Sequence, residues 1–221
     1  MERSDQSQEA SNSILPFTRR VKIQLIRHLV RCKVLSMTSQ YSDLKKVIQY
    51  TVEITGGNYN TFAFVNFIVQ LEDMLCTAVL SLDSEGYVVH GRNFDYPLAS
   101  LMKDMVLDLQ FYRGGKLLYS GVGLAGDFGI FTGYNSGISL LLNGRPANSL
   151  TLYRNMWAMV AGYERNSDLI PRVLEQHTDY NDALNDVAST PIASPCYYAI
   201  AGKSKYQGAV LTRSWTGTDG E

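Results

Sequence analysis

Three residues that together can activate a thiol lie close to one another in the middle of the sequence: Cys76, Arg92 and Asp95. Cys76 opens an apolar run over 76–80, and the other two belong to a run over 90–96. The segment 83–86 between them has the composition of a hairpin turn. The sequence therefore predicts two strands that fold back on each other and bring the three side chains together.

A guanidinium beside a thiol favours the nucleophilic thiolate, and an arginine stays charged throughout. The base that removes the thiol proton need not be a histidine. An α-amine, with an ordinary pKa of about 7.7–8.0, can accept the proton of a nucleophile on its own residue. This chemistry requires a chain break between Leu75 and Cys76, and Asp95 is suited to bind the amine. The thiol of Cys76 can make that break by attacking the preceding carbonyl, after which water hydrolyses the thioester.

Two other interpretations of these residues stay open at this point. In the first, Cys76 is a buried strand residue and Arg92 forms a salt bridge with Asp95. In the second, His90 is the partner of the thiol. A turn over 83–86 places Cys76 opposite Asn93, and in that register His90 points away from Cys76 or lies remote from it.

Bulk composition excludes several classes of protein. The chain has 221 residues, 45% of them hydrophobic and 19% charged, which is ordinary for one globular domain. A net charge of −1 gives no electrostatic reason to expect a nucleic-acid partner. The three cysteines, Cys32, Cys76 and Cys196, are too few for a disulfide framework, and their spacing matches no zinc site. We expect neither a metal nor a cofactor.

Hydrophobic periodicity predicts helices, then strands, then helices, then strands again, which indicates an α+β layered fold. Residues 1–13 are polar and predicted to be disordered, and 17–35 form a basic amphipathic pattern. Ser42 can cap the next helix, which Gly56 and Gly57 end. The predicted helices cover 17–35, 42–55, 60–74, 151–164, 168–177 and 179–188. The predicted strands cover 76–82, 87–93, 105–112, 117 onward, 130–134, 137–142, 196–201 and 209–212.

Three further patterns admit more than one interpretation. Residues 121–126 fit the glycine spacing of a dinucleotide site, but no helix is predicted to open there, so a glycine-rich bend in a sheet is favoured. Asn135 is a turn residue or an oxyanion donor. Trp157 and Tyr163 lie at helical spacing and are predicted to be core residues or the wall of an acyl-chain tunnel.

The run that starts at Cys76 and the segment 86–97 also resemble a known family. They are similar to the start of the mature β-subunit of acid ceramidase and N-acylethanolamine-hydrolyzing acid amidase, in the choloylglycine-hydrolase branch of the N-terminal nucleophile hydrolases. Segment 64–68 resembles the end of the α-subunit, and 191–202 and 210–213 also fit. The resemblance extends from about residue 40 to 213, and 91–97 lean toward the acylethanolamine amidase.

The resemblance implies an αββα sandwich and hydrolysis of a lipid amide, with N-acylethanolamines as first substrate class and ceramides as second. It implies that Cys76 is the nucleophile, that Arg92 supports the thiolate and substrate, and that Asp95 orients the amine. It also implies an N-terminal helical segment over 1–75, a catalytic domain over 76–221, an α/β heterodimer after cleavage, peripheral contact with membranes or micelles, and a lysosomal location.

The sequence departs from the family pattern in three places. The family's asparagine beyond its Thr-Arg strand, and a later arginine, have no counterpart after Arg213, which predicts a fold incomplete at its C-terminus. Loss of one oxyanion donor typically lowers a rate about 10²–10³-fold. Gly144 stands where the family has a glutamate, and the family's usual signal peptide is not visible at the polar start of this sequence. A catalytically impaired relative that binds lipid or a paralogue therefore stays an alternative.

Overall fold

The computed structural model describes residues 42–56, 58–59, 75–95, 103–125, 127, 129–146 and 149–219. The chain divides into two compact units, Met1–Phe64 and Val65–Glu221. The first contains the helix α3 (Ser42–Thr55), which ends where Gly56 adopts a left-handed φ of 66° and donates its N–H to Val52. This end agrees with the glycine stop predicted from the sequence.

The second unit contains all the described strands and three longer helices. Its elements follow the predicted order. They are β1 (Leu75–Leu82), β2 (Val88–Asp95), the short 3₁₀ helix η2 (Lys103–Met105), β3 (Val106–Arg113), β4 (Lys116–Leu124), β5 (Ile130–Tyr134), β6 (Ile138–Gly144), α6 (Ser149–Ala161), α7 (Asn166–Gln176), α8 (Tyr180–Ser189), β7 (Cys196–Gly202) and β8 (Gly208–Arg213).

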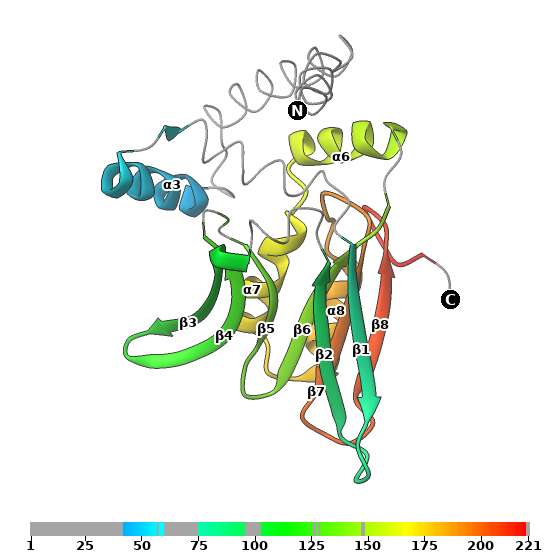
Figure 1. The fold of residues 1–221 in the computed structure, drawn as a ribbon. Helices are drawn as coiled ribbons and strands as arrows, with labels where there is room; N and C mark the ends of the chain where they lie inside the picture. Colours follow the sequence, from blue (N-terminus) through cyan, green and yellow to red (C-terminus); the bar gives the residue numbers. More distant parts are fainter. Residues whose placement is uncertain are drawn as a thin grey trace, which may run out of the picture. The chain divides into compact units, whose positions relative to one another are not determined.

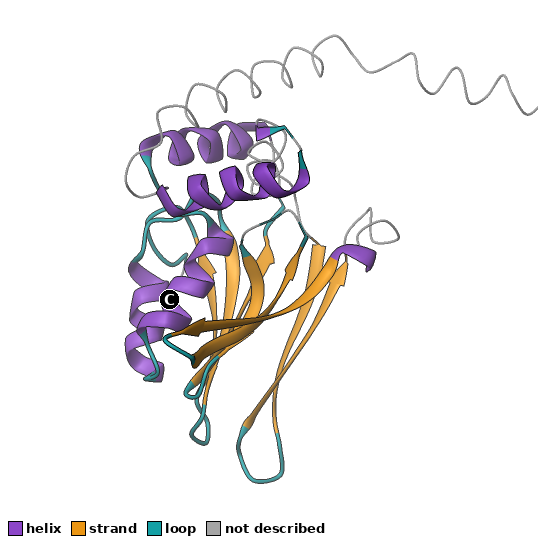
Figure 2. Cartoon of the chain, turned by 90° about the vertical axis from the view of Figure 1, so that its left-hand side faces the viewer, coloured by secondary structure: helices purple, strands orange, loops and turns teal. Residues whose placement is uncertain are grey.

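The strands of the second unit form two antiparallel sheets (Figure 1). One has six strands in the order β3-β4-β5-β6-β7-β8, and the other is the β1–β2 hairpin. The hairpin lies over β6 and β7, whereas α7 and α8 cover the opposite face of the large sheet, as Figure 2 shows. Helix, sheet and sheet therefore stack as three layers. The α+β fold predicted from the sequence is confirmed.

Glycines allow close approach within these layers. A Cβ on Gly133 in β5 would lie 2.6 Å from Cδ1 of Leu174, which projects from α7, and 2.9 Å from the carbonyl oxygen of Ser120 in β4. A Cβ on Gly121 would lie 2.8 Å from Cδ1 of Ile130. The glycine-rich segment therefore belongs to strand β4 and to close packing between strands, as the favoured interpretation predicted.

Substitution of Gly133 by alanine is expected to destabilise the second unit. The added methyl group must displace the Leu174 side chain and press on a backbone oxygen, so we expect the free energy of unfolding to fall by about 1–3 kcal/mol. Urea denaturation followed by circular dichroism measures the change. Gly91→Ala is the matched control, because nothing lies within 4 Å of a Cβ on Gly91. Equal stability of the two variants would contradict this account.

The hairpin turn differs from the prediction by one residue. Leu82 pairs with Val88 and Cys76 pairs with Phe94, not with Asn93. The reason is a three-residue turn, 84–86, in which Gly86 has a φ of 90°. The Asp83 carboxylate accepts hydrogen bonds from the backbone N–H groups of Glu85 and Tyr87. The predicted register was therefore wrong, although the predicted proximity of Cys76 and Arg92 holds.

Helix α6 differs from the prediction in what it buries. Trp157 is 66% exposed, so the prediction that it is a core residue was wrong. Ala158 and Met159 on the same helix are buried instead. The predicted features over 1–13, 17–35 and 60–74 lie outside the described residues.

A buried arginine joins the last strand to the helix layer. Arg213, at the end of β8, is fully buried, and its guanidinium donates to the carbonyl oxygens of Val187, Thr190 and Gly217. The first two carbonyls belong to the last turn of α8 and its cap, where a positive charge stabilises the helix dipole. This contact fixes α8 against the sheet that carries the site described next.

Candidate active site

The centre of the site is a contact between a thiol and a guanidinium. Cys76 opens β1 and Arg92 lies on β2, and Nη2 of Arg92 donates to Sγ of Cys76 at 3.0 Å. Both side chains are half-buried, and Cys76 packs against the hydrophobic core. A cation at this distance stabilises a thiolate, the nucleophilic form of cysteine.

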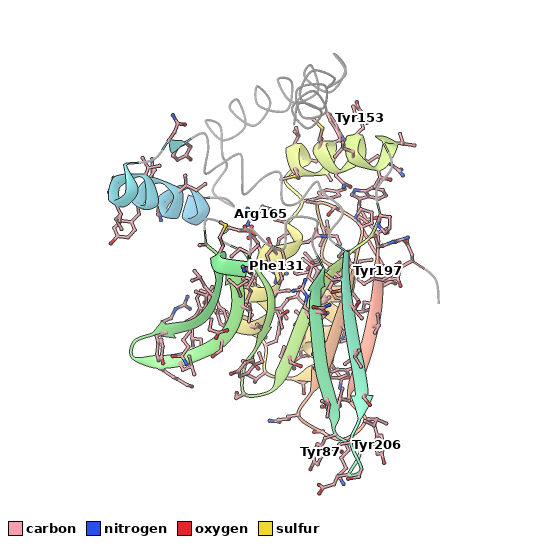
Figure 3. All side chains as sticks on the ribbon, viewed as in Figure 1. Tyr87, Phe131, Tyr153, Arg165, Tyr197 and Tyr206 are labelled. Atoms are coloured by element: carbon pink, nitrogen blue, oxygen red, sulfur yellow. The ribbon has the colours of Figure 1, made fainter. Side chains whose placement is uncertain are left out.

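Two residues of β5 hold the guanidinium in place. Nη1 of Arg92 donates to Oγ1 of Thr132 at 3.0 Å, and the guanidinium carbon lies 5.7 Å from the ring centroid of Phe131. Phe131 is buried at one end of the sheets, opposite the end where Tyr87 and Tyr206 lie (Figure 3). Because its two terminal nitrogens bind different partners, Arg92 is directed at the sulfur of Cys76 by the large sheet.

Strand alternation explains why the thiol and the guanidinium share one face. On β1 and β2 the even-numbered residues 76–80 and 88–92 are half-buried, whereas the odd-numbered residues 77–81 and 89–93 are exposed. Ala78 pairs with Arg92, and Cys76 lies two residues further along the same face. The period of two along a strand therefore directs both side chains toward the large sheet.

The third predicted residue, Asp95, ends β2. Its backbone pairs with Leu75, the residue that directly precedes Cys76, so its main chain lies beside the predicted cleavage point. The Asp95 side chain lies outside the described residues, and its predicted role stays a prediction. The alternative salt bridge between Arg92 and Asp95 is likewise untested.

His90 lies on the same face as Cys76 but too far along it to act as a partner of the thiol. It pairs with Leu80, four residues from Cys76, which corresponds to about 13 Å along a strand. Its Nδ1 lies 2.9 Å from Oγ of Ser139, and its Nε2 is buried without a hydrogen-bond partner among the described residues. The interpretation of His90 as a dyad partner is therefore not supported.

The burial of His90 predicts a dependence of stability on pH. Desolvation lowers the pKa of His90 below its ordinary value of 6.5, so the folded chain binds fewer protons at this site than the unfolded chain does. The stability that the neutral imidazole of His90 contributes is therefore fully present above pH 6.5. It decreases as the pH falls below 6.5 and stops decreasing below the folded-state pKa.

We therefore expect His90→Asn to flatten the fall in unfolding free energy between pH 6.5 and 5 by up to about 1.4 kcal/mol per pH unit. Urea denaturation of both proteins at several pH values measures the two slopes. Identical slopes for the wild type and the variant would show that His90 does not contribute.

Two other candidate residues prove to be structural. Asn135 donates its amide to the carbonyl oxygens of Leu174 and His177 and accepts from the N–H groups of Gly137 and Ile138, so it is a turn residue and not an oxyanion donor. Burial raises the pKa of Cys196 to about 12, which keeps its thiol protonated in the core. Among the described residues, no group of three or more His, Cys, Asp and Glu side chains could hold a metal ion.

Sequence reasoning did not find Phe131, Thr132 or Asn143 as parts of the site. Asn143, near the end of β6, donates its side-chain Nδ2 to the carbonyl oxygen of Cys76 at 3.4 Å. Periodicity predicts each strand but does not indicate which strands of two different sheets face each other. The signal that was available is polarity: Thr132 and Asn143 are polar residues in strands that are mostly apolar.

Comparison with known proteins adds independent evidence on the family. A scan against protein-family models finds no match. The chain is 32% identical to N-acylethanolamine-hydrolyzing acid amidase of Cavia porcellus over 171 residues, which cover 75% of this chain and 48% of that protein. It is 29% identical to acid ceramidase of Rattus norvegicus over 177 residues, which cover 73% and 45%. The chain thus spans about half the length of the curated relatives it matches.

A solved structure supports the same assignment. The N-acylethanolamine-hydrolyzing acid amidase ortholog of Caenorhabditis elegans superposes with a TM-score of 0.60 at 28% identity, covering 66% of this chain and 62% of the other. The α+β layers are thus those of the N-terminal nucleophile hydrolase fold predicted from the sequence. These similarities in sequence and structure support the family of N-acylethanolamine-hydrolyzing acid amidase and acid ceramidase for this chain.

Proposed function

We propose that this chain is a self-processing cysteine amidase that hydrolyses N-acylethanolamines to a fatty acid and ethanolamine. The observation that carries the proposal is the 3.0 Å contact between Nη2 of Arg92 and Sγ of Cys76 at the start of β1. The names of the relatives support the substrate class, because five of those compared are N-acylethanolamine-hydrolyzing acid amidases.

Maturation comes first in this proposal. Sγ of Cys76 attacks the carbonyl carbon of Leu75, the peptide C–N bond breaks, and a thioester and a free α-amine form. Water then hydrolyses the thioester, which releases the carboxylate of Leu75 and restores the thiol. The products are an α-subunit that ends at Leu75 and a β-subunit that begins at Cys76, held together as a heterodimer.

Turnover uses the new α-amine as the base. The amine accepts the proton of the Cys76 thiol, and the thiolate, stabilised by Arg92, attacks the carbonyl carbon of the lipid amide. The C–N bond of the substrate breaks as the α-ammonium returns a proton to the leaving ethanolamine. Water, deprotonated by the same amine, hydrolyses the acyl thioester and releases the fatty acid. Asp95 orients the amine in this scheme.

Ceramide is the second candidate substrate, because acid ceramidases are among the similar proteins. The reaction is the same hydrolysis of an N-acyl bond, with sphingosine as the leaving amine. A lysosomal location follows from the family resemblance and belongs to the same proposal.

Contact with lipid surfaces is supported by exposed apolar residues on α6. Leu150, Tyr153 and Trp157 are 65%, 66% and 66% exposed and recur at helical spacing. An apolar stripe of this kind suits a helix that lies at a membrane or micelle surface. Within the described part of the chain, no helix is both long and apolar enough to cross a bilayer.

Fatty-acid release at mildly acid pH tests the proposed function. The purified chain is incubated with an N-acylethanolamine or with a ceramide of the same acyl chain, in detergent micelles, and the free fatty acid is measured by mass spectrometry. Faster release from the N-acylethanolamine supports the first substrate, and faster release from ceramide supports the second. Release from neither, by protein that is intact and folded, favours a non-catalytic relative that binds lipid or a paralogue.

A further inference from the structure

The side chain of Asn143 touches the main chain of the proposed nucleophile with one atom and leaves the other unused. Its Nδ2 donates to the carbonyl oxygen of Cys76 at 3.4 Å. Its Oδ1 is buried and has no hydrogen-bond partner among the described residues. A buried acceptor without a partner has lost its hydration without compensation, so it calls for an explanation.

The hairpin register shows where the nitrogen of Cys76 lies relative to this amide. The backbone N–H of Asp83 donates to the carbonyl oxygen of Tyr87, so residues 83 and 87 are a hydrogen-bonded pair across the hairpin. Because such pairs alternate in an antiparallel ladder, the odd-numbered residues of β1 direct their backbone groups toward β2. Even-numbered residues, Cys76 among them, direct theirs away from β2.

The contact with Asn143 agrees with this direction. The carbonyl oxygen of Cys76, which faces away from β2, is the one that Nδ2 of Asn143 binds. In an extended residue the N–H and the C=O point to the same side. The nitrogen of Cys76 therefore lies on the side occupied by the Asn143 amide, whose free atom is an acceptor.

We propose that Asn143 is the anchor of the α-amine that cleavage creates at Cys76. A primary amide carries both a donor and an acceptor. Nδ2 holds the carbonyl oxygen of Cys76, and Oδ1 accepts an N–H of the new amine. This inference rests on the proposed self-processing. Before cleavage the nitrogen has one N–H in a fixed peptide plane, whereas the free amine has more donors and can rotate.

The anchor gives the amine the orientation that catalysis needs. A neutral amine has two N–H donors and one lone pair. With one N–H held by Asn143 and the other by Asp95, the lone pair is left to take the proton from Sγ of Cys76. Asn143 is thus a positioning residue, which acts on the substrate only through the amine.

Two substitutions of Asn143 separate this role from a structural one. Asn143→Leu removes both hydrogen bonds at nearly the same volume, and we expect kcat to fall about 10²-fold with KM unchanged, since a misplaced group costs about this much. Asn143→Asp has the same shape, but its carboxylate favours the ammonium form. We expect it to move the acid limb of the kcat/KM profile upward by about one pH unit.

Asn185→Asp is the matched control. It places the same new charge on an exposed position of α8, and it should keep the wild-type kcat and the wild-type acid limb. Thermal unfolding identifies any variant that fails to fold. If Asn143→Leu does not fold, the position of the acid limb in the isosteric Asn143→Asp variant is sufficient to test the anchor.

Intact mass and steady-state kinetics at several pH values give the outcomes. Cleaved Asn143 variants with the expected fall in kcat and shift of the limb support the anchor. Cleaved variants with wild-type kcat and limb overturn it. A folded Asn143→Asp chain that is never cleaved also overturns the anchor, because Asn143 would then act in the cleavage itself and not on the amine that cleavage creates. An uncleaved or inactive wild type refutes the proposed function itself.

Discussion

Replacement of Cys76 by alanine is expected to leave the chain in one piece and to abolish the release of fatty acid. Both reactions of the proposed scheme begin with attack by the same sulfur atom, first on the carbonyl of Leu75 and then on the substrate. Loss of a covalent nucleophile lowers kcat by about 10⁶-fold in well-studied hydrolases, so residual turnover should be undetectable. Fatty-acid release by mass spectrometry measures the loss.

Two further variants control this experiment. Cys196→Ala removes the other described cysteine, whose thiol is buried in the core and kept protonated, and it should keep cleavage and turnover. Cys76→Ser should be cleaved slowly and turn over slowly, because a hydroxyl gives up its proton less readily than a thiol does. Normal turnover by Cys76→Ala would refute the assignment of the nucleophile.

Replacement of Arg92 by methionine is expected to lower kcat/KM about 10²–10³-fold. The substitution keeps most of the side-chain volume but removes the cation that lies 3.0 Å from Sγ of Cys76. Arg92→Lys should recover only part of the rate, because an ammonium group lacks the planar fork whose two terminal nitrogens bind Cys76 and Thr132 separately. Thr132→Val, which leaves the guanidinium in place but unsupported on one side, should have a smaller effect.

Alkylation of the thiol separates the electrostatic role of Arg92 from a role in folding. Iodoacetamide reacts with the thiolate, so its rate constant with Cys76 at mildly acid pH should fall in Arg92→Met and stay unchanged in Arg113→Met. Arg113 is exposed on β3, the edge strand of the large sheet, whereas Cys76 and Arg92 lie on the separate β1–β2 hairpin. Equal alkylation rates in the two variants would argue that Arg92 does not support the thiolate.

Periodicity and turn composition predict most of the fold of the second unit. The alternating runs and the residues between them place both bounds of every described strand except β4 within two residues of those observed, and for β4 they predict only the start. The bounds of α7 and α8 agree equally well, whereas the helix predicted over 151–164 extends beyond the end of α6 at Ala161. The hairpin register fails by one residue because its turn has three residues and not four, a difference that depends on the left-handed φ of Gly86. Composition cannot distinguish these two turns.

The site is predictable along the strands but not between the sheets. The spacing of Cys76 and Arg92 on a hairpin predicts their contact, whereas the contact of Asn143 with Cys76 joins residues from two separate sheets. The prediction that Trp157 is buried fails for a related reason. Helical spacing indicates which residues share a face, but not whether another element covers that face. Both failures concern packing between distant segments, which a local pattern does not record.

The most direct test of this account is the intact mass of the wild-type chain after incubation at mildly acid pH, beside Cys76→Ala treated in the same way. The account predicts two wild-type fragments whose masses correspond to hydrolysis between Leu75 and Cys76, and a single full-length species for the variant. A wild-type chain that stays whole while it releases fatty acid, or a variant that is cut at the same bond, would contradict it.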